Sequence, residues 1–518
     1  MYFCSIITHT LYYMRHYLFI ICISLSVSIS GFSQNAPKQE FRGAWIHVIG
    51  QSQYAAMQPD EMKAYFIKML DSLAVCHINA FIFQVRPTAD AFYDSDIEPW
   101  SKYLTGTQGV APFRNFDPMS FLIKEAHKRN MEFHAWLNPF RVTASENDVL
   151  CAGHIYYRYP ERFIKYGKQI FFDPGNPENR KFICAVIKDI VSRYDVDAIH
   201  FDDYFYPYPI SGESFKDDDS FNRYAFGQGF KSNQLNDWRR NNVNMLIEDI
   251  KRTIVQTKPW VRFGISPFGI YRNKKNTPDG SGSDTNGLQN YDELYADVLL
   301  WAKKGWIDYL VPQIYWEIGH AAADYDTLIR WWSNQKTNAQ LYIGQDVDRT
   351  VKTPDRINPQ VNQLPAKMKL ERTLPDVEGN CWWSGYSLIS NVQGIADSLK
   401  NNYQKYPALI PAYVHLHKKA PKDVKKLKAE WTPTGYFLHW KQNGDPVNPE
   451  KAQYYVIYRF GDKEKTNLAD PSKIICITRE TSYFLPYDKG KIKYKYVVTS
   501  VDRFQNETKK GKSKTVKL

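Results

Sequence analysis

Two adjacent carboxylates, Asp202 and Asp203, end a short apolar run at residues 196–201 and precede a cluster of aromatic residues. Paired carboxylates can supply a general acid, a general base or a nucleophile. Alternation along a strand sends His200 and Asp202 to one side, so that side becomes polar where the strand ends. The alternative is that both aspartates only cap the next element. The aromatic residues that follow favour a sugar-binding rim over a helix cap.

Strands and helices that alternate along the chain must position this pair. Apolar residues at helical spacing predict a helix over residues 177–194, directly before the carboxylate strand. The same reading predicts strands at residues 41–48, 77–85, 131–138, 196–201, 261–267, 307–315, 340–345 and 379–384, and helices at 59–74, 118–130, 177–194, 234–257, 291–304, 323–337, 359–372 and 392–402. No glycine-rich phosphate loop follows the first strand. The eight units therefore predict the α/β class, as a (β/α)8 TIM barrel rather than an open dinucleotide-binding sheet.

In such a barrel the active site is built where the strands end. The candidate catalytic residues are the carboxylates Asp202, Asp203 and Glu317. The candidate substrate-binding residues are polar and aromatic side chains at the strand exits, namely Arg42, Trp45, His47, Gln84, Arg86, Asn138, Arg141, His200, Tyr204, Tyr206, Ser266, Gln313, Tyr315, Trp316, Asp346 and Trp383. Aromatic faces stack on sugar rings, so a concave site of this composition suits a carbohydrate. A long loop at residues 142–176 is expected to form a lid or a binding wall.

The carboxylates allow two mechanisms of glycoside cleavage. In a retaining mechanism one aspartate attacks the anomeric carbon and Glu317 protonates the leaving oxygen, which requires about 5 Å between carboxyl groups. In a substrate-assisted mechanism the aspartates orient a 2-acetamido group that is itself the nucleophile, and the acid is the second aspartate or Glu317. Single residues also have structural interpretations, since His200 can be a hydrogen-bonded lumen residue, Arg42 and Arg86 can close ion pairs, and Glu317 can begin a helix.

Residues 418–518 differ in character from the rest of the chain. Short strands are expected near residues 435–440, 454–458 and 493–501, as in a small β-sandwich. Trp440, Tyr494 and Tyr496 resemble the core residues of fibronectin type III modules. The chain has a net charge of +12, and these residues carry all of it. This charge predicts either weak attraction to anionic envelope polymers or an ordinary solvated lysine-rich face.

The first 33 residues have the pattern of a secretory signal peptide, with a charged start, an apolar stretch at residues 17–29 and small residues at 30–33. Translation can begin at Met1 or at Met14. The mature chain is expected in the periplasm, the cell envelope or the medium, with a barrel domain at residues 34–415 and a sandwich at 418–518. No later apolar run reaches 18 residues, so no membrane span is expected.

The remaining composition argues against several other functions. Five cysteines of the mature chain are scattered, which predicts neither a disulfide framework nor a metal site. The acidic loop at residues 216–219 lacks the glycine and terminal glutamate of a calcium loop. Neither a cofactor nor a metal is therefore expected. Nucleic acid is not an expected partner, because no binding motif is present.

Several motifs resemble the bacterial glycosyl-hydrolase-like family 10 over residues 40–400. They are Phe-Arg-Gly-Ala-Trp at 41–45, Phe-Gln-Val-Arg-Pro at 83–87, Ala-Trp-Leu-Asn-Pro at 135–139, Asp-Pro-Gly-Asn-Pro at 173–177, Ile-His-Phe-Asp-Asp-Tyr-Phe-Tyr-Pro at 199–207 and Val-Pro-Gln-Ile-Tyr-Trp at 311–316. The resemblance implies an exported TIM-barrel glycosidase that cleaves peptidoglycan glycan strands without stem peptides. Two alternatives stay open, a hydrolase of dietary or host polysaccharides and a glycan-binding protein without activity.

Overall fold

The structure is a computed structural model that describes residues 36–113, 116–443 and 448–518. The expected signal peptide lies outside the described residues, so export stays a prediction. Residues 38–518 form one compact unit. In the described part of the chain, no helix is both long and apolar enough to cross a membrane.

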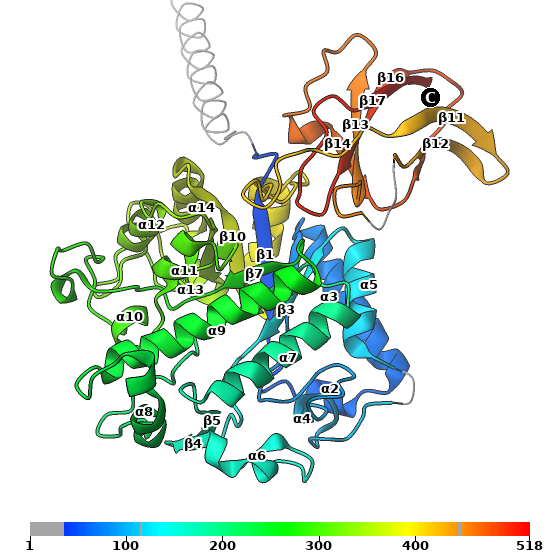
Figure 1. The fold of residues 1–518 in the computed structure, drawn as a ribbon. Helices are drawn as coiled ribbons and strands as arrows, with labels where there is room; N and C mark the ends of the chain where they lie inside the picture. Colours follow the sequence, from blue (N-terminus) through cyan, green and yellow to red (C-terminus); the bar gives the residue numbers. More distant parts are fainter. Residues whose placement is uncertain (1–35, 114–115, 444–447) are drawn as a thin grey trace, which may run out of the picture. The chain divides into compact units, whose positions relative to one another are not determined.

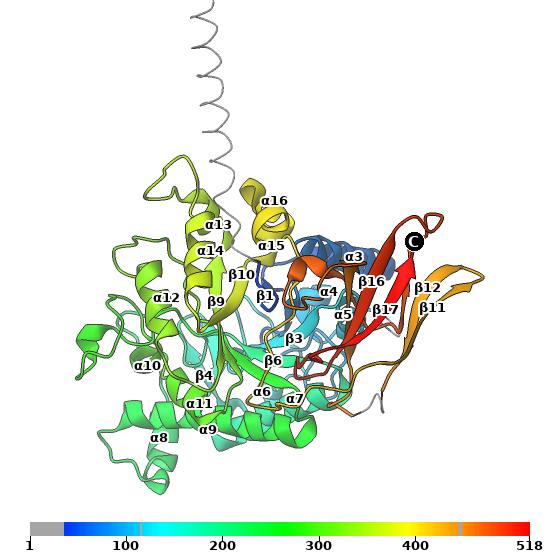
Figure 2. The same ribbon diagram turned by 90° about the horizontal axis from the view of Figure 1, so that it is seen from above.

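Eight parallel strands close into a barrel in the order β1-β10-β9-β8-β7-β6-β3-β2 (Figures 1 and 2). The strands are β1 (Phe41–Ile46), β2 (Ala80–Arg86), β3 (Glu132–Leu137), β6 (Ala198–Phe201), β7 (Arg262–Ile265), β8 (Tyr309–Leu310), β9 (Gln340–Asp346) and β10 (Val377–Trp383). This closed, all-parallel arrangement confirms the predicted TIM barrel.

Helices cover the outside of the strands (Figure 1). The helices of seven or more residues are α3 (Pro59–Val75), α5 (Pro118–Lys128), α7 (Pro177–Arg193), α8 (Asp218–Tyr224), α9 (Leu235–Thr257), α11 (Val298–Lys304), α12 (Tyr325–Ser333) and α14 (Leu364–Thr373). Shorter helices are α2 (Gln53–Ala56), α4 (Lys102–Thr105), α6 (Ile155–Arg158), α10 (Asn290–Glu293), α13 (Val347–Lys352), α15 (Gly385–Ile389) and α16 (Ile395–Ser398). Local sequence fixes where they begin: the Asp117 side chain accepts the N–H of Ser120, and Pro118 stands in the first turn of α5.

Two apolar layers fill the barrel and its helical cover. Inside the lumen, Phe41 stacks on Tyr342 with ring centroids 3.9 Å apart, and Trp136 and Tyr309 belong to the same cluster. The alternate residues of the strands, such as Ile199 and Phe201 on β6, pack outward against the helices. The predicted alternation of β6 is thereby confirmed, since Ala198 and His200 face the lumen and the strand ends before Asp202.

Several predicted elements differ from the structure. The loop expected at 142–176 contains α6 and a hairpin of β4 (Phe163–Tyr166) and β5 (Gln169–Phe172). The strand expected at 307–315 is reduced to β8, because Pro312 has no N–H to donate to a ladder. The helix expected at 291–304 divides into α10 and α11 around Tyr295, whose φ is 53°. The helix expected at 359–372 begins at Leu364. The one expected at 392–402 is present, but it changes type along its length, from a 3-10 turn (Val392–Gly394) through α16 to a π-helical turn (Leu399–Tyr403).

The C-terminal segment forms two antiparallel sheets. One has the order β11-β12-β15 and the other β14-β13-β16-β17. Their strands are β11 (Lys425–Thr432), β12 (Gly435–Lys441), β13 (Tyr454–Gly461), β14 (Ile474–Thr478), β15 (Ser482–Phe484), β16 (Lys493–Val501) and β17 (Lys512–Lys517). Trp440 of one sheet lies edge-on to Tyr455 of the other at 5.3 Å, and both belong to one buried cluster. The two sheets therefore pack face to face around a common core.

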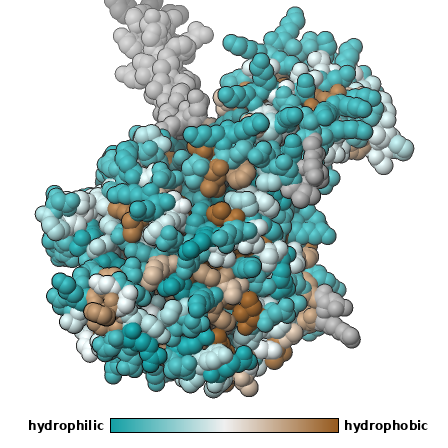
Figure 3. All heavy atoms as spheres, viewed as in Figure 1, coloured by the Kyte–Doolittle hydropathy of each residue, from teal (hydrophilic) through white to brown (hydrophobic). Residues whose placement is uncertain are grey.

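The C-terminal segment contacts the N-terminal ends of the barrel strands. Gln505 donates to Glu132 at 2.5 Å, and Glu132 also pairs with Arg262 at 2.5 Å. Arg503 pairs with Asp195 at 2.9 Å, just before β6. This segment thus covers the end of the barrel opposite to the one where Asp202 lies. On the face drawn in Figure 3, hydrophobic residues occur in separate groups within a mainly hydrophilic surface.

Candidate active site

A cavity of about 340 Å³ lies at the C-terminal ends of the barrel strands. Both aspartates of the pair line it, together with an unusual proportion of aromatic side chains. The complete lining is Trp45, Trp136, Asp202, Asp203, Tyr204, Tyr208, Ser266, Phe268, Gln313, Tyr315, Trp316, Arg349 and Trp383. The volume is near the lower end of the range of about 300–1,000 Å³ that is usual for small-molecule sites.

Three donors hold the Asp202 carboxylate in place. Trp136 Nε1 donates to Oδ2 at 3.1 Å, Asn138 Nδ2 donates to Oδ1 at 3.0 Å, and the N–H of Tyr204 donates to Oδ1 at 3.3 Å. The Asn138 side chain is itself fixed, because its Oδ1 accepts the backbone N–H of Arg141 at 2.8 Å. Burial raises the pKa of Asp202, while the nearby Arg141 charge and these donors oppose the rise. Asp202 is thus an oriented carboxylate whose Oδ2 can still accept another hydrogen bond.

Asp203 is electrostatically different from its neighbour. Its side chain accepts a hydrogen bond from the Tyr208 hydroxyl, and the residue is 2% exposed. Burial and the adjacent Asp202 charge raise the pKa of Asp203 to about 7, against the hydrogen bonds from Tyr208 and Gln313. A carboxylic acid with a pKa near neutrality can hold a proton and release it during a reaction. The pair therefore combines one oriented carboxylate with one candidate general acid.

A chain of hydrogen bonds runs below the cavity through the barrel lumen. Trp45 Nε1 donates to His200 Nε2 at 3.0 Å, so Nε2 accepts and Nδ1 carries the proton toward Tyr309 Oη at 3.1 Å. Tyr309 in turn contacts His134 Nδ1 at 2.8 Å, and His134 Nε2 contacts Glu132 at 2.9 Å. Burial and the neighbouring His134 hold the pKa of His200 well below its ordinary value. Neutral His200 thus supports Trp45 from below and does not reach the cavity itself.

Aromatic rings form the walls. Tyr315 and Trp383 lie nearly parallel with centroids 6.5 Å apart, and Tyr204 stacks on Tyr208 at 5.2 Å. Arg141 lies with its guanidinium carbon 5.0 Å from the Tyr204 ring centre, which fixes that ring from behind. Flat apolar faces directed into a polar cavity match the C–H faces of sugar rings.

The structure brings most of the predicted exit residues to this cavity, directly or as supports. Trp45, Tyr204, Ser266, Gln313, Tyr315, Trp316 and Trp383 line it. Asn138, Arg141 and His200 hold lining residues in position. His47 lies at the edge, with its ring 4.9 Å from Trp383, and burial lowers its pKa to about 4.

Other predicted site residues are engaged elsewhere. Arg42 is fully buried near the start of β1 and pairs with Glu40 at 2.7 Å. Arg86 makes a two-pronged pair with Glu98, at 2.7 and 2.6 Å. Gln84 accepts the N–H of Val48 at 3.0 Å. These side chains thus fit the structural interpretation, in which they stabilise strands and loops around the site rather than binding substrate.

Tyr206, Asp346 and Glu317 also lie outside the cavity lining. Tyr206 is buried against Arg239 and contacts Asp217 at 3.3 Å. Asp346 caps α13 by accepting the N–H of Arg349 at 2.7 Å. Glu317 follows the lining residue Trp316, but its carboxylate is not part of the wall. Its absence from the lining weakens the mechanism in which it acts as the acid.

Four lining residues were not expected from the sequence. Trp136 shares the lumen side of β3 with His134, so alternation carried a signal for it. Tyr208 and Phe268 lie in irregular segments, where no periodicity indicates direction. Arg349 lies in the first turn of α13, a helix that was not predicted.

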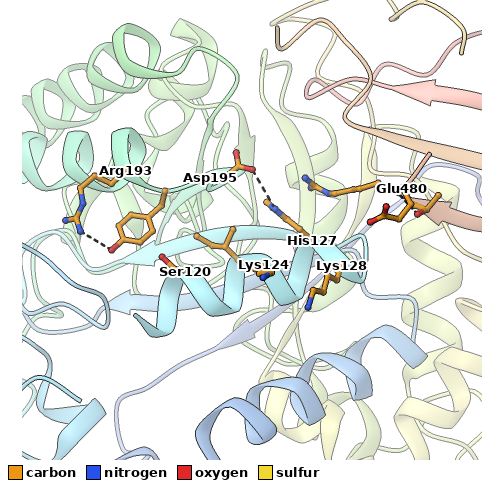
Figure 4. A pocket seen from close by; sticks show the side chains of 11 residues that line it. Ser120, Lys124, His127, Lys128, Arg193, Asp195 and Glu480 are labelled. Atoms are coloured by element: carbon orange, nitrogen blue, oxygen red, sulfur yellow. Dashed lines mark hydrogen bonds and ion pairs between the residues drawn. The ribbon is translucent and has the colours of Figure 1, made fainter. Parts of the chain in front are cut away.

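A second hollow, of about 480 Å³, lies near the N-terminal ends of β3 and β6 (Figure 4). It is lined by residues of α5, by Asp195 after α7 and by Arg479 and Glu480. Its charged groups largely neutralise one another: His127 contacts Asp197 at 2.7 Å, Lys128 pairs with Glu125 at 2.5 Å and Asp195 pairs with Arg503 at 2.9 Å. Such compensated pairs suit an interface between structural elements more than a reaction site.

Metal chemistry has no candidate in the described residues. They contain no group of three or more side chains of the metal-binding types in a suitable arrangement. Cys76, Cys151, Cys184, Cys381 and Cys476 are free thiols. Asp217 of the acidic loop pairs with Arg239 at 2.5 Å, and Asp218 begins α8.

A closed (β/α)8 barrel with an aspartate pair in an aromatic cavity at its C-terminal face defines the architecture of a TIM-barrel glycosidase. The chain belongs to the glycosyl hydrolase-like 10 family, whose model matches residues 40–363. It is 40% identical over 512 residues to glycosyl hydrolase YngK of Bacillus subtilis, covering 97% of this chain and 98% of the relative. It is 35% identical over 369 residues to glycosyl hydrolase DigH of Escherichia coli K12, covering 66% and 82% of the two chains.

Solved structures are more distant. The catalytic domain of β-amylase from Paenibacillus polymyxa superposes with a TM-score of 0.43 at 12% identity, over 71% of this chain and 99% of that one. The spore cortex-lytic enzyme SleL of Bacillus megaterium gives a TM-score of 0.37 at 11% identity, over 69% and 75%. The assignment to the family rests on the sequence relatives and not on these superpositions.

Proposed function

We propose that the protein is an exported glycoside hydrolase that cleaves N-acetylhexosamine glycans of the bacterial envelope, specifically peptidoglycan glycan strands without stem peptides. The observation that supports catalysis most directly is the difference between Asp202 and Asp203 within one aromatic cavity. Burial and the Asp202 charge raise the pKa of Asp203 to about 7, while three donors orient Asp202. Family membership supports glycan hydrolysis in general, and the particular glycan is the proposal.

The adjacent positions of the two aspartates favour the substrate-assisted mechanism. A retaining enzyme with a protein nucleophile places its two carboxyl groups on opposite sides of the scissile bond. Asp202 and Asp203 follow one strand, and Glu317, the candidate partner across the barrel, does not line the cavity. A substrate acetamido group therefore supplies the nucleophile in our proposal.

Each step can be assigned to a side chain. Asp203 gives its proton to the glycosidic oxygen as the bond from that oxygen to C1 breaks. The acetamido oxygen forms a bond to C1 at the same time, and Asp202 Oδ2 accepts the acetamido N–H. Water then attacks C1 and gives a proton to the Asp203 carboxylate. The bond between the acetamido oxygen and C1 breaks at the same time. The proton and the electron pairs balance over the two steps, and Asp203 returns to its starting state.

Product analysis tests this function. The purified protein is incubated with amidase-treated and with untreated peptidoglycan, and mass spectrometry identifies the fragments. We expect glycan fragments from the amidase-treated material, and inhibition by a thiazoline analogue of the cyclised intermediate. Cleavage of dietary or host polysaccharides in preference to both materials would contradict the proposal, as would binding without any fragments.

We propose further that the C-terminal segment is a fibronectin type III-like module that associates with anionic envelope polymers. The division into sheets of three and four strands and the buried Trp440 support the first part. The net charge of +12 that residues 418–518 carry supports the second. Sedimentation with cell-wall material at increasing ionic strength tests it, because screening should release the protein.

A further inference from the structure

Thirteen of the described residues line the cavity, and among them Arg349 alone carries a positive charge. It lies in the first turn of α13, directly after β9. In the closed barrel β9 is separated from β6 by β8 and β7, so Arg349 and the Asp202–Asp203 pair lie on nearly opposite walls. A glycan bound between them contacts carboxyl groups on one side and a guanidinium on the other.

The charge of Arg349 is not neutralised by an ion pair in the described part of the chain. No carboxylate oxygen among those residues lies within 4.0 Å of its guanidinium nitrogens, whereas neighbouring acids are engaged elsewhere. Asp346 caps the helix through the N–H of Arg349, and Asp348 pairs with Lys352 at 2.5 Å and accepts the Ser387 hydroxyl at 2.6 Å. The guanidinium is exposed, in contrast to the buried Arg42 and Arg86.

The other cations near the cavity are not available to a ligand. Arg141 is 8% exposed, donates to the carbonyl of Pro87 at 3.2 Å and lies behind the Tyr204 ring. Lys367 is fully buried behind the wall that carries Arg349. There it donates to the carbonyl of Trp316 at 2.9 Å and contacts the Thr350 hydroxyl at 3.1 Å. An anionic group of a ligand therefore finds its counter-charge at Arg349.

We infer that Arg349 is a specificity-determining residue that binds a carboxylate carried by the glycan. This inference rests on the proposed function and names the group that the site recognises. In a peptidoglycan strand without stem peptides, the lactyl group of each muramic acid ends in a free carboxylate. A planar guanidinium can bind that carboxylate through two parallel hydrogen bonds.

The same contact explains why stem peptides would prevent cleavage. When a peptide is attached, the lactyl carboxylate becomes a neutral amide and can no longer form a charge-assisted pair with Arg349. Asp202 on the far wall repels a carboxylate, so the two walls together fix which side of the sugar faces Arg349. Selection against peptide-bearing strands then arises from a missing charge in addition to the bulk of the peptide.

The test compares two glycans that differ only in this charge. Soluble peptidoglycan glycan fragments without stem peptides are used as such, and after conversion of their lactyl carboxylates to methylamides. For the wild-type protein we expect kcat/KM to fall about tenfold or more on methylamidation, the usual size for the loss of a charge-assisted hydrogen bond. For Arg349→Gln we expect nearly equal values on the two glycans, and Arg349→Lys should retain part of the preference.

A control variant removes a charge from the same helix. Lys352→Gln takes away a cation one turn further along α13, outside the cavity lining, and should leave the ratio of the two kcat/KM values unchanged. Because the Arg349 side chain is exposed and has no ion pair in the described residues, Arg349→Gln should keep the thermal midpoint of the wild type.

Binding to an Asp203→Asn background separates this inference from the proposed function. Calorimetry measures the affinity of both glycans in that background, with and without Arg349→Gln. Binding that depends on Arg349 and on the carboxylate, without turnover by the wild type, supports the inference and contradicts the function. Turnover with an unchanged ratio in Arg349→Gln contradicts the inference alone, and neither binding nor turnover contradicts both. If a uronate oligosaccharide binds more tightly than the peptidoglycan glycan, and this binding depends on Arg349, then Arg349 does bind a carboxylate. The inference that this carboxylate is the lactyl group would be overturned.

Discussion

The two ends of the barrel carry buried carboxylates in opposite electrostatic situations. At the N-terminal end, burial would raise the pKa of Asp197, but the charge and hydrogen bond of His127 hold it far below its ordinary value. Asp308 is likewise held low despite its burial, because Lys251 pairs with it at 2.6 Å. At the C-terminal end, burial and the Asp202 charge raise the pKa of Asp203 to about 7.

The comparison shows that burial alone does not set the state of a carboxylate. Asp203 and Asp308 are buried and the Asp197 side chain is only 11% exposed, so the neighbours decide whether the charged or the neutral form is favoured. Compensated charges at the N-terminal end contribute to the stability of the barrel and its contact with the C-terminal segment. At the other end the Asp203 carboxyl pairs with no cation in the described residues, which costs stability and provides a proton donor. A loss of stability of this kind is expected at a catalytic site, where function requires a group that destabilises the fold.

The largest effect is expected from Asp203→Asn. The amide keeps the shape of the side chain but has no proton to donate, so kcat should fall by about 10²–10⁴-fold. Steady-state cleavage of glycan fragments without stem peptides measures this. Asp219→Asn makes the same chemical change at an exposed position of α8 and should leave kcat unchanged. Wild-type kcat in Asp203→Asn would remove Asp203 from the mechanism.

Arg262→Met should have the next largest effect, on stability. It leaves Glu132 buried without its cation, which typically costs about 3–5 kcal/mol of the free energy of unfolding. Denaturant unfolding measures this, with Arg330→Met as the control, since Arg330 pairs with Asp326 at 3.0 Å on an exposed helix face. Equal losses in both variants would show that the N-terminal network has no special role.

Asp203→Asn should also change the pH dependence of stability. The pKa of Asp203 is raised in the folded state, so between about pH 4 and pH 7 the folded protein retains a proton that the unfolded chain releases. The wild type therefore loses free energy of unfolding as the pH rises through this window, by up to about 4 kcal/mol. Thermal unfolding at pH 8 should show Asp203→Asn to be more stable than the wild type, with little difference at pH 4.

Asp197→Asn should show the opposite dependence. The pKa of Asp197 is lowered in the folded state, so its contribution is present above the unfolded value of about 4 and is lost at lower pH. The variant should thus be less stable than the wild type at pH 8. If Asp203→Asn and Asp197→Asn change the free energy of unfolding in the same direction at pH 8, the two ends of the barrel do not differ in the way proposed.

The smallest effect is expected from Tyr208→Phe. The Tyr208 hydroxyl donates to Asp203 and so opposes the rise of its pKa. Since catalysis needs protonated Asp203, kcat/KM of the wild type should decline as the pH rises through about 7. Without the hydroxyl, this decline should move to higher pH, with a change of only a few-fold at pH 7. A shift to lower pH would contradict the assigned hydrogen bond.

Much of the fold could be predicted because it depends on local patterns. Apolar residues at helical spacing and Asp–Pro or Asn–Pro starts define α5 and α7 within a few residues. Predictions failed where tertiary contacts or single backbone positions decide. The β4–β5 hairpin lies in a stretch that looked like a loop, and Tyr295 at φ 53° interrupts an otherwise helical pattern.

The sequence by itself determined that eight strand–helix units follow one another and that an aspartate pair stands where a strand ends, because side-chain periodicity and chain order are local properties. Only the tertiary structure decided the state and the partners of each charged group. Arg86 was expected at the site but pairs with Glu98, whereas Arg349 was not expected and faces the cavity without an ion pair among the described residues. A charge depends on groups that distant segments bring within a few ångströms, and spacing along one chain does not contain that information.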